Sequence, residues 1–513
     1  RIWASLHMTL NATASAVEDD RRAMPTDIDR LFVYQINTWV WLNTMSRRYG
    51  ETITLHNIPD VELDTIARPG VDMVWMMGVW QRRPAGRQNA LKYKHEYRGA
   101  LPDVIDDDVV GSAYALYDYE VDERIGGRDG LAALRKRLRR RGLTLMLDFV
   151  PNHMGLDHPW IESHPDYFIN GTEADLKRQP QNYTIVRRSH GDAIMAYGRD
   201  PYFSGWPDTL QLNYGNPATQ TAMLGELLQI ADQCDGVRCD MAMLVLPEVF
   251  ARTWGISAPP FWPKAIAGIR QKHPEFCFLA EVYWEMEWTL QQQGFNYAYD
   301  KRLYDRLHTG FIRPVREHLF AGLEFQDKLA RFLENHDEPR AAATFRPGAH
   351  EVAALVTYLS PGMRFFHQGQ FEGHTKRISP HLVRGPKEPT NPDIQHFYEQ
   401  LLTLLKRPVF RDGNWQLLNC ASAWDDNWTW DCFIAFAWTG SQGEQWIVVV
   451  NGVPHQSQCR LRLPFPNMEG KTVCVLDALS QKKTEREGGE LMWRGLYLDL
   501  PAWGYQILQV SNC

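Results

Sequence analysis

Short apolar runs rich in β-branched and aromatic residues recur along the chain, and longer amphipathic segments separate them. The first run covers residues 31–36 and follows a polar, weakly periodic stretch, residues 1–30, which we interpret as an N-terminal extension. Further runs cover residues 73–80 and 143–150, with a helical pattern at residues 129–141 between them. A strand, a helix and a second strand in this order are typical of a parallel βα unit.

The same alternation continues toward the C-terminus. Helical patterns occur at residues 220–233 and 261–272. Further strands are predicted at residues 236–239, 277–282, 295–299, 332–334 and 363–366, which brings the predicted strands to eight. Eight βα units predict an α/β fold, the closed (β/α)8 TIM barrel, whose catalytic groups lie just beyond the carboxyl ends of the strands.

Two segments depart from this rhythm. Residues 153–213 are rich in Pro, Gly, Asn and Trp and show no clear helix, so we expect an inserted domain after the third strand. Beyond a helical pattern at residues 394–406, short alternating apolar runs predict an all-β C-terminal domain. The predicted organisation is a barrel of residues 31–153 and 214–410, an inserted domain B of residues 154–213, and a C-terminal β-sandwich of residues 411–513.

The composition narrows the classes of partner. The 513 residues carry 55 basic and 62 acidic side chains, a formal net charge of −7 that argues against nucleic acid or an anionic membrane as partner. An uncharged substrate fits better, and the aromatic fraction of 12% supplies flat rings on which sugars can stack. No apolar run approaches the ~20 residues that span a bilayer, and no signal-peptide pattern opens the sequence, so the cytoplasm is the expected compartment.

Other familiar chemistries lack their motifs. The eight cysteines are scattered, without a CxxC pair or zinc-like spacing, which favours structural or free thiols. GxSxG, Walker, HExxH and GxGxxG motifs are absent from the sequence. We therefore expect no cofactor, and the readings of serine hydrolase, nucleotide-binding protein and zinc protease are excluded.

Four acidic segments end four of the predicted strands: residues 148–153 (DFVPNH), 236–240 (GVRCD), 280–284 (AEVYW) and 334–337 (ENHD). Hydrolysis of a glycosidic bond with retention needs two carboxylates about 5–5.5 Å apart, one as nucleophile and one as acid and then base. Strand ends of a barrel can supply such a pair from distant parts of the sequence. In these four motifs, their order and their spacing, the chain resembles the α-amylase family, glycoside hydrolase family 13, over roughly residues 31–410.

The resemblance implies a role for each acidic residue of the motifs. Asp240 corresponds to the nucleophile, Glu281 to the general acid and base, and Asp337 to the carboxylate that stabilises the oxocarbenium-like transition state. Arg238, two residues before Asp240 on the same face of its strand, is expected to keep that carboxylate ionised. Carboxylates at barrel rims also form structural ion pairs, and Asp148 fits that plainer interpretation.

The resemblance also implies a set of substrate-binding residues. His153 and His336 correspond to histidines that hydrogen-bond the sugar at the cleaved bond, and Tyr114 to a tyrosine that stacks under it. Trp284, just after Glu281, can either stack on the leaving-group sugar or pack in the core.

The predicted function is that of a retaining α-glycoside hydrolase acting on α-linked glucans or maltooligosaccharides. Two alternatives stay open, namely an α-glucan transglycosidase or α-glucosidase with the same triad, and a non-catalytic barrel that acts as a binding module. One departure from the family concerns metal binding. Many members bind calcium through the Asn of the first motif, carboxylates of the inserted domain and the backbone carbonyl of a His four positions after the nucleophile. Here Asn152 is present, Asp208 is a possible carboxylate, and the fourth position is Leu244, which also has a backbone carbonyl. The apolar run of residues 241–246 nevertheless offers no side-chain oxygen to complete a shell of six to eight oxygens, so no metal is expected.

Overall fold

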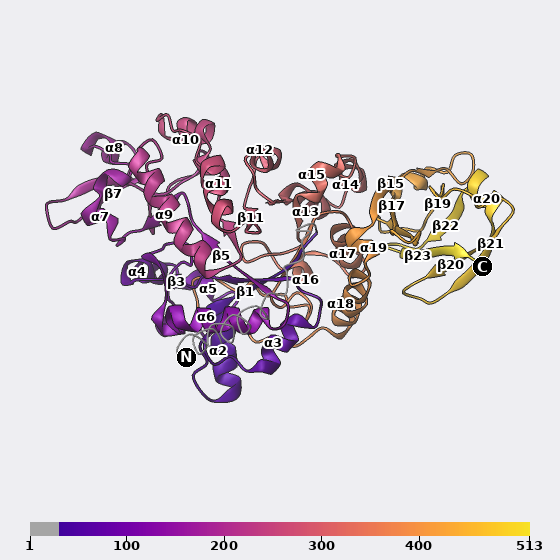
Figure 1. The fold of residues 1–513 in the computed structure, drawn as a ribbon, viewed down its shortest axis with the longest axis horizontal. Helices are drawn as coiled ribbons and strands as arrows, with labels where there is room; N and C mark the ends of the chain where they lie inside the picture. The colour runs from indigo at the N-terminus through magenta and orange to yellow at the C-terminus, as the bar shows by residue number, and fades with distance from the viewer. Residues whose placement is uncertain (1–29) are drawn as a thin grey trace, which may run out of the picture.

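The computed structural model describes residues 30–513, so the predicted N-terminal extension lies outside the described residues apart from Arg30. Eight parallel strands close into a barrel in the order β1-β14-β13-β12-β11-β10-β5-β2. Each barrel strand therefore lies beside the barrel strands that precede and follow it along the chain, and the predicted (β/α)8 barrel is confirmed (Figure 1). The barrel strands are β1 Phe32–Asn37, β2 Met73–Met77, β5 Thr144–Phe149, β10 Gly236–Cys239, β11 Cys277–Ala280, β12 Tyr297–Tyr299, β13 Leu329–Arg331 and β14 Met363–His367.

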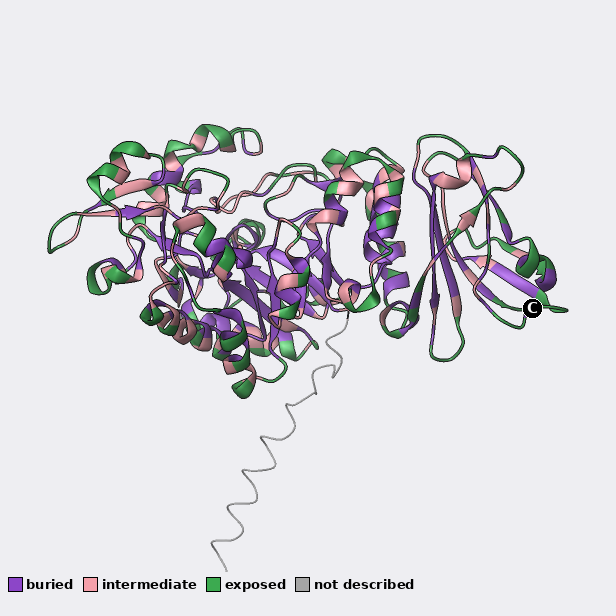
Figure 2. Cartoon of the chain, turned by 90° about the horizontal axis from the view of Figure 1, so that it is seen from above, coloured by how far each residue is buried: buried purple, intermediate pink, exposed green. Residues whose placement is uncertain are grey.

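The burial of the barrel strands explains why their sequences are nearly continuous apolar runs. Strands β2 and β14 are buried at every position, and the barrel strands form the buried centre of the larger part of the molecule in Figure 2. Parallel strands are covered on both faces, by the barrel interior on one side and by helices on the other. The helices that follow these strands along the chain are α2 Thr38–Tyr49, α3 Asp60–Ala67, α6 Gly127–Arg139, α9 Pro217–Gln233, α10 Pro247–Trp254, α11 Trp262–Lys272, α12 Glu287–Gln292, α13 Lys301–Thr309, α14 Ile312–His318, α15 Leu323–Asp327, α16 Ala341–Thr344, α17 Ala349–Tyr358, α18 Pro392–Leu405 and α19 Val409–Asp412.

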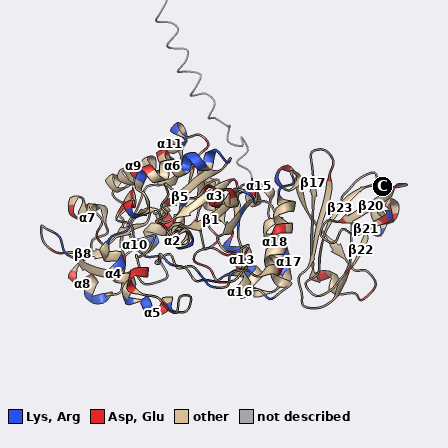
Figure 3. Ribbon diagram, turned by 90° about the horizontal axis from the view of Figure 1, so that it is seen from below, with Lys and Arg blue, Asp and Glu red and all other residues tan. Residues whose placement is uncertain are grey.

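Helix α6 shows how the barrel helices are fixed to their neighbours. Its basic outer side does not simply face solvent, because Arg135 and Arg139 both pair with Asp235 and Arg137 pairs with Asp60. Lys and Arg lie mixed with Asp and Glu over the barrel in Figure 3.

Two excursions leave the barrel at its carboxyl end. One, between β2 and α6, contains β3 Trp80–Gln81, α4 Pro84–Lys92, α5 Lys94–Tyr97 and β4 Asp118–Val121. The other, between β5 and α9, contains β6 His153–Gly155, α7 Trp160–Ser163, α8 Glu173–Arg178, β7 Tyr183–Val186, β8 Ala193–Ala196 and β9 Thr209–Gln211. The sequence showed no clear helix in the second excursion because α7 and α8 span four and six residues, too few to reveal a periodicity.

The C-terminal part is all-β, as predicted. A six-stranded sheet, in the order β15-β17-β18-β23-β20-β21, faces a three-stranded sheet, β16-β19-β22. The strands are β15 Asn414–Leu418, β16 Cys420–Ala421, β17 Phe433–Thr439, β18 Gln445–Asn451, β19 Ser457–Leu461, β20 Thr472–Asp477, β21 Lys483–Glu487, β22 Leu496–Leu500 and β23 Tyr505–Asn512, and a short helix, α20 Gly488–Trp493, lies between β21 and β22. A disulfide joins Cys474 to Cys513.

The side chains of β17 and β18 point alternately to the two faces of their sheet, and this alternation explains how the C-terminal domain is attached to the barrel. Ala435 and Val449 face the smaller sheet and belong to its apolar cluster. Phe436 and Trp438 point the other way and belong to the apolar cluster of the barrel. The indole N–H of Trp438 also donates to the carbonyl oxygen of Leu359 at the end of α17, at 2.8 Å. The C-terminal domain therefore shares a continuous core with the barrel.

Two predicted strand boundaries are wrong. The seventh strand is β13, Leu329–Arg331, and not residues 332–334. The charge of Arg331 interrupts the apolar pattern, but its side chain is fully buried in an ion pair with Asp300. The second strand ends at Met77 because Gly78 adopts a positive φ of 79° and donates its amide to the buried carboxylate of Asp148, at 2.7 Å.

Within residues 30–513, no helix is both long and apolar enough to cross a membrane.

Removal of the Trp438 ring tests the attachment of the C-terminal domain. Because the side chain is fully buried, Trp438→Ala should destabilise the protein by about 3–5 kcal/mol and lower its urea unfolding midpoint. Trp424, which is 53% exposed in the same domain, supplies the control, and Trp424→Ala should change stability by less than about 0.5 kcal/mol. Equal effects of the two substitutions would contradict the shared core.

Candidate active site

The predicted strand-end motifs meet at the carboxyl end of the barrel. Asp240 directly follows β10 and Glu281 directly follows β11. The two strands are neighbours, and Cys239 at the end of one lies opposite Ala280 at the end of the other. The amide of Glu281 donates to the Cys239 carbonyl oxygen at 3.0 Å, which continues the pairing past the strands. The register therefore brings the two carboxylates together.

Arg238 links these two carboxylates. Its fully buried guanidinium places Nη1 2.6 Å from Oδ1 of Asp240 and Nη2 2.8 Å from Oε2 of Glu281. The contact with Asp240 is a hydrogen bond, whereas the contact with Glu281 is an ion pair without hydrogen-bond alignment. Nε donates to the hydroxyl of Tyr299 at 3.2 Å. Arg238 thus contacts the carboxylate that it is expected to keep ionised, and it also contacts Glu281, which the sequence did not indicate.

The surroundings of Glu281 favour its protonated form more than those of an ordinary glutamate do. Burial raises its pKa to about 7, with Arg238 opposing the rise and Asp240 adding to it. The hydroxyl of Tyr283 donates to Oε1 at 2.9 Å, and the amide of Met241 donates to Oε2 at 2.7 Å. Glu281 is thus held in one orientation with a pKa suited to exchanging a proton near neutral pH.

Asp240 occupies a different electrostatic position. Burial also raises its pKa above the ordinary range of an aspartate, but Arg238, hydrogen-bonded directly to its carboxylate, opposes the rise. Met241, the next residue, has a positive φ of 42°, an uncommon conformation for a residue with a side chain. Such backbone strain next to a buried carboxylate is characteristic of functional sites.

Asp337 and His336 lie in the loop after β13. His336 is almost fully buried, and its Nε2 lies 3.0 Å from Oδ2 of Asp337. The Asp337 side chain keeps 50% of its surface exposed, against 8% for Asp240 and 4% for Glu281. Of the three carboxylates, Asp337 is therefore the one most open to a molecule that enters the site.

Tyr114 is brought to the same cluster. Its hydroxyl lies 2.7 Å from Nε2 of His336, and its ring lies 5.2 Å from the guanidinium carbon of Arg238. The other ring nitrogen of His336, Nδ1, lies 2.7 Å from the side-chain nitrogen of Gln35 on β1. Gln35 is fully buried on a barrel strand, and its contact fixes the orientation of the imidazole.

His153 approaches from β6. It is buried, and its ring packs edge-on against Trp206 at 5.2 Å. Burial lowers the pKa of His153 to about 4, although a hydrogen bond with the Tyr114 backbone opposes the change. The imidazole is therefore neutral at physiological pH and lies beside the Tyr114 loop.

Trp284 connects the Glu281 loop to the second excursion. It has a positive φ of 61°, and its ring meets that of Tyr202 edge-on at 4.9 Å. The guanidinium of Arg252, on α10, lies over both rings, 5.3 Å from Tyr202 and 6.0 Å from Trp284. Since Trp284 is only half-buried and Tyr202 is exposed, these rings form an accessible aromatic surface three residues from Glu281.

Sequence reasoning missed two residues of the site, Gln35 and Tyr299. Both belong to strands that were predicted, and both point into the barrel, where Gln35 contacts His336 and Tyr299 contacts Arg238. The one indication of a role for Gln35 in the sequence is that it is a polar residue within the apolar run of β1. A tyrosine at a strand end carries no comparable signal, because core packing explains it equally well.

Comparison with known proteins adds the family. A model of the α-amylase catalytic domain matches residues 60–400. The chain belongs to the α-amylase family. It is 23% identical over 286 residues to an α-amylase of Haloarcula japonica, covering 54% of this chain and 39% of that protein. It is 22% identical over 329 residues to the intracellular maltogenic amylase of Bacillus subtilis, covering 60% of this chain and 52% of that protein. These alignments thus span about half the length of the relatives or less.

Solved α-amylase structures share the fold over nearly the whole chain. A maltogenic α-amylase of Thermotoga neapolitana superposes with a TM-score of 0.68 at 16% identity, covering 94% of this chain and 99% of that one. An α-amylase of Lactobacillus plantarum superposes with a TM-score of 0.65 at 18% identity, covering 93% and 98% of the two chains. At this level of identity the likeness concerns the fold.

Asn152, the first residue of the calcium site of many α-amylases, is engaged with another side chain of this chain. The side chains of Asn152 and Gln211 exchange two hydrogen bonds, with the Asn152 oxygen accepting at 2.9 Å and its nitrogen donating at 3.1 Å. Leu244 is buried, and its backbone carbonyl is the one oxygen that it has. Among the described residues, the one group of metal-ligating side chains close enough to share an ion is Cys474, Glu485 and Cys513, far along the chain and containing the disulfide. The Asn152 oxygen is thus already a hydrogen-bond acceptor, and calcium would need five or more further oxygens beside it.

Dialysis against EDTA tests this conclusion. Since a ligand that binds only the folded state raises its stability, a chain without the calcium site should keep its melting temperature and activity after chelation. Differential scanning calorimetry with and without added calcium measures this directly. A drop of many degrees that calcium reverses would contradict the prediction.

Proposed function

We propose that the protein is a retaining α-glycoside hydrolase that acts on α-linked glucans or maltooligosaccharides through a covalent glycosyl-enzyme. The observation that carries this proposal is the pairing of Asp240 and Glu281 with the single guanidinium of Arg238. Two carboxylates held this close, with different surroundings, suit the retaining mechanism, in which one attacks the sugar and the other handles the proton.

The first step uses Glu281 in its protonated form. Asp240 attacks the anomeric carbon while Glu281 gives its proton to the departing glycosidic oxygen, so the carbon–oxygen bond breaks and a glycosyl ester forms on Asp240. In the second step ionised Glu281 takes a proton from water, and the oxygen of that water attacks the same carbon. The ester bond breaks, Asp240 regains its charge, and Glu281 is again protonated.

The surrounding residues suit the binding of the sugar at the cleaved bond. Asp337 faces the open side of the site and would stabilise positive charge that develops on the sugar ring. His336 and neutral His153 would hydrogen-bond its hydroxyl groups, and Tyr114 would lie under the ring. These roles follow from the family resemblance together with the contacts of the four side chains.

A transglycosidase is the second candidate, and the Trp284 surface favours it. An accessible aromatic surface next to the acid can retain an acceptor sugar, which then replaces water in the second step. One relative with 26% identity, from Bifidobacterium longum, is named an α-1,4-glucan:maltose-1-phosphate maltosyltransferase. Chromatography of the products from maltoheptaose separates the two activities, because only transfer yields longer chains. A non-catalytic barrel is disfavoured because all three carboxylates are present.

We propose the cytoplasm as the compartment, which the name of the Bacillus subtilis relative, intracellular maltogenic amylase, supports. The Cys474–Cys513 disulfide is more typical of oxidising compartments. Fractionation of the source cells, with a thiol titration of the purified protein, decides between them.

The proposed function predicts the outcome of one substitution and of one product assay. Asp240→Asn should leave the fold intact and lower turnover of maltooligosaccharides by several orders of magnitude, because the amide cannot form the glycosyl ester. The wild-type protein should release the α-anomer first, as early proton NMR spectra of the products will report. Asp107→Asn, at a carboxylate whose side chain is 93% exposed, is the control and should retain full activity. Near-normal turnover by the Asp240→Asn variant, or a β-anomer as the first product, would contradict the proposal.

The raised pKa of Glu281 predicts the dependence of activity on pH. The acid is competent only while protonated, so kcat/KM should fall as pH rises through about 7, an apparent value that belongs to the coupled carboxylates together. Glu281→Gln should abolish this alkaline limb and harm substrates with sugar leaving groups far more than activated aryl glycosides. Equal losses on both kinds of substrate would count against an acid role.

A further inference from the structure

The helix α20 carries the most exposed large apolar side chain in the described part of the protein. Trp493, its last residue, is 76% exposed, and no aromatic or cation–π contact of its ring is found. The helix lies in the C-terminal domain, at the opposite end of the molecule from the second excursion of the barrel (Figure 1). This tryptophan therefore belongs neither to the core nor to the active site.

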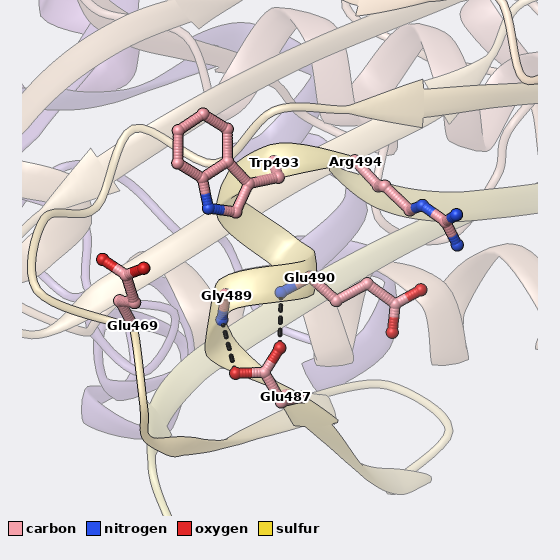
Figure 4. Close-up of a pocket in the computed structure, with 6 residues that line it drawn as sticks. All are labelled: Glu469, Glu487, Gly489, Glu490, Trp493 and Arg494. Carbon is pink, nitrogen blue, oxygen red and sulfur yellow. Dashed lines mark hydrogen bonds between the residues drawn. The ribbon is translucent and has the colours of Figure 1, made fainter.

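Trp493 stands beside a surface depression of about 460 Å³. Its lining also includes Glu469, Glu487 and Glu490, with Gly489 and Arg494. In Figure 4 the indole nitrogen of Trp493 points toward the side on which Glu469 and Glu487 lie, whereas Glu490 and Arg494 extend the other way. The ring and the Glu469 carboxylate thus flank the same side of α20.

The depression is rigidly built. Both carboxylate oxygens of Glu487 accept hydrogen bonds from the start of α20, from the amide of Gly489 at 2.9 Å and from that of Glu490 at 2.7 Å. A Cβ on Gly488 would lie 1.8 Å from the carbonyl oxygen of Met468, so only glycine lets the helix contact the loop that carries Glu469. The backbone of α20 is therefore held against the loop that carries Glu469.

The free groups of the depression define the ligand that it fits. Glu487 is used by the helix, but Glu469, Glu490 and Arg494 have no side-chain hydrogen bond or ion pair with any described residue. Three carboxylates against one guanidinium repel phosphates, nucleic acids and anionic lipids. A flat ring beside a hydrogen-bond acceptor instead matches a sugar, which presents an apolar face of C–H groups and an edge of hydroxyl donors.

We propose that Trp493 and Glu469 form a second carbohydrate-binding site, which holds an α-glucan chain on the C-terminal domain away from the active site. This proposal rests on the proposed function for the choice of glucan. The ring of Trp493 stacks on one glucose unit, and the Glu469 carboxylate accepts hydrogen bonds from its hydroxyl groups. Because the C-terminal domain shares a core with the barrel, a bound chain or granule is kept at a fixed position relative to the active site.

Sedimentation with granular starch tests the proposal in the Asp240→Asn background, in which the granules are not degraded. Trp493→Ala should weaken granule binding about tenfold, Glu469→Gln should weaken it less, and Trp493→Phe should retain most of it because a ring remains. Trp424→Ala, at an exposed tryptophan of the same domain outside the depression, is the matched control and should change binding less than twofold. Equal unfolding midpoints of the four variants and their parent exclude a folding defect.

Activity measurements separate this proposal from the proposed function. With Asp240 intact, Trp493→Ala should cleave a chromogenic maltotrioside at the wild-type rate and degrade granular starch more slowly. Three results would overturn the second site without affecting the maltotrioside result. They are a parent protein that does not bind granules, a Trp493→Ala variant that binds them normally, and equal losses of binding in Trp493→Ala and Trp424→Ala. The parent protein could instead bind immobilised polylysine but not starch, and Trp493→Ala could abolish that binding. This result would show that the depression binds cationic ligands and not sugars. A wild-type protein that cleaves no α-glucoside would refute the proposed function itself.

Discussion

The ion pairs of Arg238 are the constraint on which the active site depends. A buried guanidinium is costly unless its charge is compensated, and here two carboxylates compensate it at 2.6 and 2.8 Å. The positive charge of Arg238 also offsets the repulsion between Asp240 and Glu281 and so allows both carboxylates to lie close together. Replacement of Arg238 would leave two buried carboxylates facing each other, and one of them would have to bind a proton.

The register of the barrel makes this arrangement possible. Because β10 and β11 are adjacent and paired up to Cys239 and Ala280, the next residue of each strand falls at the same height. Arg238 lies two residues before Asp240 on the same face of β10, so its side chain extends toward both carboxylates. A shift of one residue would turn either Glu281 or both Arg238 and Asp240 toward the helices, so the arrangement depends on this register.

The sequence predicted the eight strands and the placement of the catalytic motifs because each motif directly follows an apolar run. It failed where the determining contact joins distant residues. Arg331 hid the true limits of β13 because its buried charge is neutralised by Asp300, thirty-one positions earlier. Gln35 and His336 meet across 301 positions, and nothing local to either residue reveals the contact. β21, whose residues are Lys, Thr, Glu, Arg and Glu, is an exposed edge strand without the apolar alternation that marks a strand in sequence.

Trapping of the glycosyl-enzyme tests the central claim most directly. A fluorinated α-glucosyl fluoride slows the hydrolysis of the intermediate more than its formation, so the sugar should remain attached to the protein. Proteolysis and mass spectrometry should then find one added sugar on the peptide that contains Asp240, and none after Asp240→Asn. A label on another residue, or a protein that turns over α-glucans without ever carrying the label, would contradict the account.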